Sequence, residues 1–216
     1  MTDTPPARRG LIPPQQRRSE QTLARILQGA MSLMATRGLA AISMEEVAAA
    51  AGVSVGTLYR RFKSREDLVA EMLRDLQLRQ LAVLETELEA DRWAGVGLEA
   101  RLDWIVARQA EAAARAPGFI RIIFASLTTR EGEADAETTR LNDRTTDLLA
   151  RWLLACEDEI GAPDPEATAR VAVAQLSISL NLARLYPASF SPLPPETVVP
   201  LLKRAALLAL RGDPQA

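Results

Sequence analysis

Between residues 59 and 65 the chain combines an aromatic hydroxyl with four positive charges, carried by Tyr59, Arg60, Arg61, Lys63 and Arg65. Guanidinium and ammonium groups placed this closely are suited to binding phosphate oxygens. The chain contains no histidine and a single cysteine, Cys156. It therefore lacks the commonest general base and any familiar zinc ligand set, so we predict no catalytic residues, no metal site and no cofactor.

Charge is divided unequally along the chain. Residues 1–65 hold ten Lys/Arg and four Asp/Glu, whereas residues 66–216 hold sixteen and twenty-four. A basic N-terminal part can approach a polyanion that would repel the acidic remainder, so the two parts are expected to have different partners. No apolar run approaches the roughly 20 residues that span a bilayer, and the first twenty residues lack the apolar core of a signal peptide. We therefore predict a cytoplasmic protein that does not enter the membrane.

Two short helices separated by a glycine are predicted to position the basic residues. Ser43 and Glu46 form a capping box, the signature of a helix start, so a short helix begins there. Gly52 tolerates the positive φ that ends such a helix, and Ser54 can cap a third helix that runs through Phe62. With a longer helix from Ser19 before them, these elements make a helix-turn-helix.

The first turn of the third helix is the part of a recognition helix that reaches base edges. Contact with a base and contact with a phosphate both stay open for Val55 and Thr57. Residues 1–18 contain four prolines and are predicted to be a flexible basic arm, in which Arg17 and Arg18 either enter the minor groove or keep the arm soluble. Besides the basic cluster, the predicted DNA-binding residues are Arg17, Arg18, Ser43, Ser54, Val55, Gly56 and Thr57.

The N-terminal part resembles the DNA-binding region of tetracycline-repressor (TetR) family transcriptional regulators over residues 25–73, RILQGAMSLMATRGLAAISMEEVAAAAGVSVGTLYRRFKSREDLVAEML. Two positions depart from the family pattern. Arg61 stands where a histidine or tyrosine is usual, and Arg65 stands where a lysine is usual. The resemblance implies a homodimer that binds an inverted repeat in double-stranded DNA, and a pocket for a small-molecule effector in the C-terminal part.

The acidic part is predicted to be entirely helical, which makes the fold all-α. We expect a flexible arm at 1–18, a helix-turn-helix domain at 19–65, and an effector-binding and dimerisation domain at 66–216. The segment GFIRIIFASL is apolar nearly all round and predicts a central helix that lines a cavity. Trp104 either stacks on Arg108 or faces that pocket, and ordinary core packing is the alternative for each aromatic residue. The predicted pocket residues are Trp104, Arg108, Phe119, Ile123, Phe124 and Trp152.

The helices at 165–186 and 196–211 are apolar around much of their circumference. They could bury each other inside one subunit or pair with their copies across a two-fold axis. Because one helix-turn-helix reads too few base pairs for specificity, we favour a dimer interface there. Its predicted residues are Leu176, Leu180, Ala183, Leu201, Ala205 and Leu208.

These features predict a ligand-responsive repressor that an effector releases from its operator. Activation instead of repression stays open. A helical protein-interaction adaptor is an alternative, although the basic cluster would then be idle. A helical-bundle enzyme is a further alternative, although the carboxylates are scattered on outward faces of the predicted helices and offer no converging catalytic group.

Overall fold

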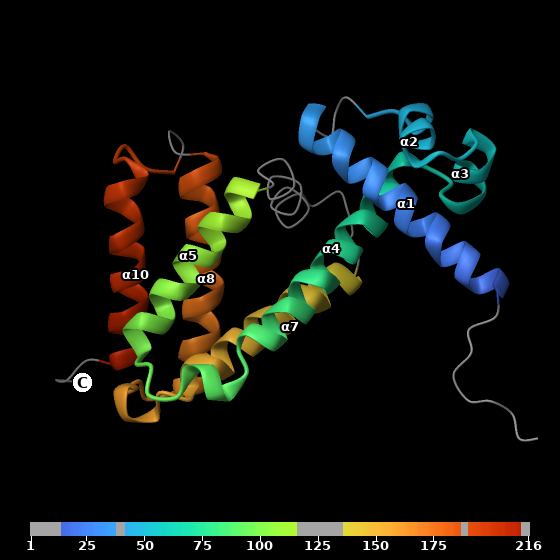
Figure 1. Ribbon diagram of the computed structural model, residues 1–216. Helices are drawn as coiled ribbons and strands as arrows, with labels where there is room; N and C mark the ends of the chain where they lie inside the picture. Colours follow the sequence, from blue (N-terminus) through green and yellow to red (C-terminus); the bar gives the residue numbers. More distant parts are fainter. Residues whose placement is uncertain (1–13, 38–41, 116–135, 187–189, 213–216) are drawn as a thin grey trace, which may run out of the picture. The chain divides into compact units, whose positions relative to one another are not determined.

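The computed structural model describes residues 14–37, 42–115, 136–186 and 190–212, and within those ranges the chain forms helices and short connections without a strand (Figure 1). The predicted all-α fold is confirmed. The chain divides into two compact units after Met72. No helix in the described ranges is both long enough and apolar enough to cross a membrane.

The N-terminal unit contains α1 (Pro14–Arg37), α2 (Met44–Ala51), α3 (Val55–Arg61) and the first residues of α4 (Arg65–Glu87). Helix α1 packs against α2, and α2 against α3. The core of this unit is made of apolar residues that share one face of each helix, including Ile26, Val47, Leu58, Leu68 and Met72, all of which are at most 2% exposed. Burying one apolar face of each short helix holds the helix-turn-helix together.

The start of α1 corrects the predicted arm. The helix begins at Pro14, so Arg17 and Arg18 lie on a helix rather than in a flexible segment. Proline is tolerated in the first helical turn, because its missing N–H would have no partner there and its fixed φ suits the helix. The boundary between the two units, after Met72, also lies beyond the predicted boundary at residue 65, because Leu68 and Met72 belong to the N-terminal core.

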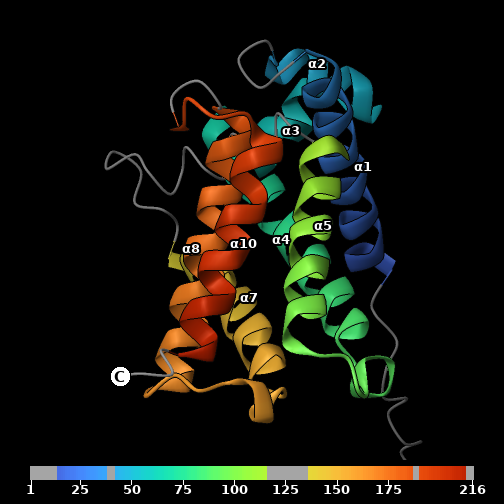
Figure 2. The same ribbon diagram turned by 90° about the vertical axis from the view of Figure 1, so that its left-hand side faces the viewer.

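The C-terminal unit contains the rest of α4, the short 3-10 turns η2 (Ala90–Trp93) and η3 (Glu157–Glu159), and four further helices. These are α5 (Leu98–Arg115), α7 (Ala136–Leu154), α8 (Pro165–Leu185) and α10 (Pro195–Arg211). Helix α8 packs against α5, α7 and α10, and it lies beside α10 in both views (Figure 1, Figure 2). The core of this unit forms between α4, α5, α7, α8 and α10.

Polar contacts fix the ends of these helices. The Glu159 carboxylate accepts a hydrogen bond from the Leu98 backbone N–H at 2.8 Å, at the start of α5, and pairs with Arg211 at 3.4 Å, at the end of α10. Lys203 on α10 reaches Asp103 on α5 at 2.8 Å, and hydrogen bonds to Asp103 and Glu99 raise the pKa of Lys203. Helix α10 is therefore linked to α5 at two places, through Glu159 at its C-terminal end and through Lys203 in its middle.

The predicted dimer interface is wrong for its residues on α8. Leu176, Leu180 and Ala183 are at most 3% exposed, because they face the core of their own unit. The large apolar residues that α8 exposes are Val171 and Ile178, at 62% and 48%. The three residues of α10 that were predicted for the dimer interface, Leu201, Ala205 and Leu208, are all exposed and therefore accessible to a partner.

Candidate functional site

The turn between α2 and α3 is built by local interactions that the sequence predicts. The Ser43 hydroxyl accepts a hydrogen bond from the Glu46 N–H at 3.2 Å, and the Glu46 carboxylate accepts one from the Ser43 N–H at 3.1 Å. The hydrogen bond that the Ser43 backbone N–H donates to the Glu46 carboxylate is the main cause of the lowered pKa of Glu46. Gly52 ends α2 with φ 62° and ψ 40°, in the left-handed region. The capping box and the glycine turn are therefore confirmed.

The first turn of α3 presents its residues to solvent. Ser54 caps the helix by accepting a hydrogen bond from the Thr57 N–H at 3.1 Å, and the two hydroxyl groups lie 2.8 Å apart. Val55 is 37% exposed. Apart from the backbone of its own helix and its chain neighbours, no atom of the described residues lies within 4 Å of the place where a Cβ on Gly56 would stand. Because nothing in the described part of the chain requires a glycine there, the open surface is available to a partner that approaches the backbone closely.

Arginines at the end of α3 meet the beginning of α1. Arg61 donates hydrogen bonds to the Ser19 carbonyl at 3.2 Å and to the Ser19 hydroxyl at 3.0 Å, while Arg60 donates to the Thr57 hydroxyl at 2.9 Å. The two helices border a shallow cleft of about 410 Å³ lined by Arg18, Ser19, Thr22, Thr57, Arg60 and Arg61. Three guanidinium groups and three hydroxyl groups make this cleft suitable for a phosphate oxygen.

The sequence did not predict Ser19 and Thr22 as site residues. Both lie in α1, where the arm was expected to end, and only the packing of α1 beside α3 brings them to the cleft. Arg17 is exposed on the same helix but does not line the cleft. The DNA contacts themselves stay predictions.

The other predicted DNA-binding residues differ in their accessibility. Tyr59 is 46% exposed, Lys63 is exposed between α3 and α4, and Arg65 is half-buried at the start of α4. The half-buried Ser43 already uses its hydroxyl to cap α2. The exposed first turn of α3 and the basic residues after it thus form a surface that can bind phosphates, and Ser43 contributes to its support.

Three tryptophan rings pack together inside the C-terminal unit. Trp93 lies 4.7 Å from Trp152 and 5.4 Å from Trp104, measured between ring centroids, and all contacts are edge-to-face. The Arg108 guanidinium lies 5.5 Å from the centre of the Trp104 ring, so the stacking alternative for Trp104 is the one observed. Sequence reasoning overlooked Trp93, which follows α4 in a short 3-10 turn.

A buried arginine supports the tryptophan cluster. Arg101 is 6% exposed and donates to the backbone carbonyls of Val96 at 3.0 Å, Trp93 at 3.1 Å and Trp152. Trp104 and Trp152 therefore pack in the core, which is the alternative to a pocket that the sequence analysis gave for the aromatic residues. Phe119, Ile123 and Phe124 lie outside the described residues, so the predicted pocket stays a prediction.

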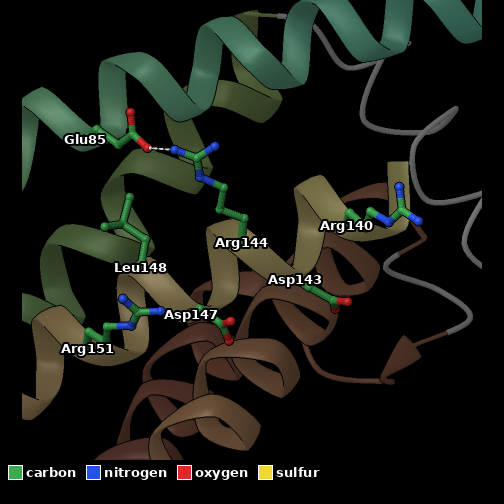
Figure 3. A pocket seen from close by; sticks show the side chains of 7 residues that line it. All are labelled: Glu85, Arg140, Asp143, Arg144, Asp147, Leu148 and Arg151. Carbon is green, nitrogen blue, oxygen red and sulfur yellow. Dashed lines mark hydrogen bonds and ion pairs between the residues drawn. The ribbon is translucent and has the colours of Figure 1, made fainter. Parts of the chain in front are cut away.

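Clefts open at several places on the surface of the C-terminal unit, and two of them lie between long helices. One of about 390 Å³ separates α4 from α7 and is lined by Leu148 and six charged residues, namely Glu85, Arg140, Asp143, Arg144, Asp147 and Arg151. Figure 3 shows Arg144 reaching across to Glu85, and the two groups lie 2.6 Å apart. Because three acids offset three arginines, the cleft carries no strong net charge.

The second cleft is an apolar groove of about 370 Å³ between α8 and α10. Small residues, among them Ala167, Ala172, Ala205 and Ala209, form much of its lining. The exposed Val171 of α8 also lines the groove, and Ile178, two turns further along α8, is exposed as well. An exposed apolar surface of this kind is typical of an interaction site.

Comparisons with known proteins cover both units. Residues 26–72 match the sequence family "Bacterial regulatory proteins, tetR family", and residues 97–210 match "Tetracyclin repressor-like, C-terminal domain". The transcriptional repressor KstR2 of Mycolicibacterium smegmatis is 46% identical over 50 residues, which cover 23% of this chain and 24% of KstR2. The regulator AcrR of Shigella flexneri is 35% identical over 72 residues, 33% of each chain. These alignments span a quarter to a third of the curated relatives' length.

Solved structures share the fold over most of the chain. Thermus thermophilus FadR, solved with lauroyl-CoA, has a TM-score of 0.67 at 21% identity and covers 89% of this chain and 97% of its own. Bacillus subtilis FadR, solved with stearoyl-CoA, has a TM-score of 0.64 at 13% identity, covering 86% and 98%. At these identities the likeness concerns the fold, and it extends to the helices of both units.

Proposed function

Because the chain belongs to the tetR family of bacterial regulatory proteins, we propose that it is a transcriptional repressor that binds an inverted-repeat DNA operator as a homodimer and leaves it when a small-molecule effector binds. The observation that carries the proposal is the helix-turn-helix of the N-terminal unit. Its third helix exposes Val55 and Gly56 in the first turn and Tyr59 and Arg60 further along.

We infer that α3 enters the major groove with its N-terminal turn toward the bases. Val55 can contact a thymine methyl group, and the bare backbone at Gly56 allows the helix to come close. Arg60 and Lys63 then lie where the flanking phosphates run, and they fix the register without reading sequence. Arg61 holds α3 against α1 through Ser19 and so positions the recognition helix.

The proposed dimer pairs the α8–α10 face with its own copy. Val171, Ile178, Leu201 and Leu208 are between 48% and 62% exposed, although each is a large aliphatic side chain. Pairing through a two-fold axis would bury these residues together with the apolar groove between the helices. A two-fold dimer also presents two recognition helices about 34 Å apart, the spacing of successive turns of DNA.

The proposed effector acts by differential affinity. Helix α4 contributes residues to both units, so a ligand that binds the C-terminal unit differently in two states can change DNA affinity through this continuous helix. Two proteins of the same fold were solved with fatty acyl-CoA esters. We therefore include lauroyl-CoA among the first effectors to be tested.

The test is selection of bound fragments from random duplex DNA, followed by binding measurements at several salt concentrations. We expect a symmetric site, and we expect Lys63→Ala to lower the slope of log K against log salt by about one per half-site. Arg79→Ala, a variant of an exposed arginine of the C-terminal unit that pairs with Asp75, serves as the control with an unchanged slope. A protein that stays monomeric and prefers no sequence would contradict the proposal.

A further inference from the structure

A small polar cluster interrupts the apolar contact between α5 and α8. Gln109 on α5 donates through Nε2 to the Ser177 hydroxyl of α8 at 2.7 Å. Arg184, two turns further along α8, donates through one Nη atom to the Val106 carbonyl of α5 at 3.2 Å. Val106 and Gln109 are three positions apart on α5, so the two contacts stand on the same side of that helix.

Each long side chain of this cluster keeps an atom without a partner. The second Nη atom of Arg184 and the Gln109 Oε1 atom are both buried and lack a hydrogen bond within the described part of the chain. Exchanging the oxygen and nitrogen of the Gln109 amide does not remove the deficit, because Ser177 can serve only one end of the amide. Buried polar groups in folded proteins are normally satisfied, so such a pair of vacancies calls for an explanation.

Arg184 also carries a charge that has no ion-pair partner among the described residues. No acidic side chain in the described ranges forms an ion pair with it, whereas Arg170 on the same helix pairs with Asp147 at 3.0 Å. Burial lowers the pKa of Arg184, which is the effect of taking a cation out of water without an opposite charge. A partly buried charge without an opposite charge is unfavourable, and an anion bound beside it would offset that cost.

We propose that Arg184, Gln109 and Ser177 bind the carboxylate group of the effector, and that the body of the effector is apolar. A carboxylate can accept from the free Nη atom of Arg184 and from Gln109 Nε2, once the Ser177 hydroxyl donates to the amide oxygen. We infer the apolar body from the surroundings of the cluster, because Ile105, Leu176 and Leu180 of the same two helices belong to the apolar core. The inference rests on the proposed effector response and adds the chemical class of the effector and the residues that hold it.

The experiment measures thermal unfolding of the full chain by tryptophan fluorescence, since all three tryptophans lie in this unit. Propionate, benzoate and octanoate are each compared with the corresponding primary amide, which has the same shape without the charge. We expect at least one acid to raise the unfolding temperature, and its amide to need at least tenfold more ligand for the same shift.

Variants locate the effect. Arg184→Met should abolish the response to the acid and, without ligand, should raise the unfolding temperature by about 3 °C, because an unpaired charge has gone. Arg184→Lys keeps the charge and should retain a preference for acid over amide at lower affinity, which provides a second variant if the methionine variant does not fold. Arg170→Met, the matched control, should respond to the acid as the original protein does.

The proposal is overturned if no acid in the panel acts, if amides act as well as acids, or if Arg184→Met still responds. A lower unfolding temperature of ligand-free Arg184→Met would also overturn it, because the cluster would then be structural and hydrated by water alone. DNA binding is measured separately by gel shift. A failure of DNA binding would defeat the proposed repressor and leave the unfolding-temperature result standing, so the two failures are distinguishable.

Discussion

Alanine substitutions at two glycines of the helix-turn-helix should change stability in opposite directions. Gly52 has φ 62°, and its Cβ position is open, with the nearest atom, Arg25 Nη1, at 4.0 Å. Gly52→Ala therefore meets no steric obstacle, and its cost is the left-handed backbone, about 1–2 kcal/mol. Alanine also lowers the conformational entropy of the unfolded chain, which stabilises the folded state by about 0.4–1 kcal/mol. We expect a net destabilisation of about 1 kcal/mol.

Gly56 lies inside α3 with an ordinary negative φ and nothing within 4 Å of its Cβ position. Alanine is the better helix former, so Gly56→Ala should stabilise this helix by about 0.5–1 kcal/mol. The same added methyl group would stand on the surface proposed to approach DNA. Gly56→Ala should therefore weaken DNA binding even though it stabilises the N-terminal unit.

Amide hydrogen exchange of the full chain measures both effects in the segment that contains the substitution. A change of 1 kcal/mol alters the protection of the α2–α3 amides about fivefold, downward for Gly52→Ala and upward for Gly56→Ala. Gly52→Asn is the control, because asparagine tolerates the left-handed region and should lose less protection than alanine. If both alanine variants shift protection in the same direction, the backbone argument is wrong.

Three further outcomes are expected. A Cβ on Gly29 would lie 3.2 Å from the Ala51 nitrogen, so Gly29→Ala should push α1 from α2 and lower the free energy of unfolding by about 1–3 kcal/mol in urea titrations. Because the pKa of Glu46 lies below its ordinary value of 4.5, the Glu46 carboxylate should stabilise α2 fully above pH 4.5 and progressively less as the pH falls below that value. Circular dichroism should show this loss of stability at low pH in the original protein and not in Glu46→Gln. Leu208→Glu should give monomers in light scattering, whereas Val83→Glu, at an exposed aliphatic residue of α4, should leave the dimer intact.

Much of the N-terminal unit could be predicted because its signals are local. The capping boxes at Ser43 and Ser64 each need only a carboxylate three residues later, and both are observed; the Asp67 N–H donates to the Ser64 hydroxyl at 3.1 Å. The turn at Gly52 needs only a residue that accepts positive φ. Interactions between residues three or four positions apart are set by the backbone, so the pattern of residue types was sufficient.

The C-terminal unit was predicted less completely, because its decisive contacts join residues far apart in sequence. Helix α8 is apolar around much of its circumference, so periodicity alone could not distinguish the buried Leu180 from the exposed Ile178. The tryptophan cluster likewise depends on α5 and α7 meeting the turn that holds Trp93. Its composition was visible in the sequence, but its assembly was not.

The sequence by itself determined the helical class, the helix-turn-helix and the basic residues at the end of α3, since backbone hydrogen bonding and residue type act over a few positions. Only the tertiary structure decided which faces of α8 and α10 are buried, and that Arg61 contacts Ser19 across 42 positions of the chain. It also placed Arg184 and Gln109 at the contact between α5 and α8, where each keeps a buried polar atom without a hydrogen-bond partner among the described residues. The physical reason is that burial and charge compensation depend on which helices pack together, and that packing brings together residues from distant parts of the chain.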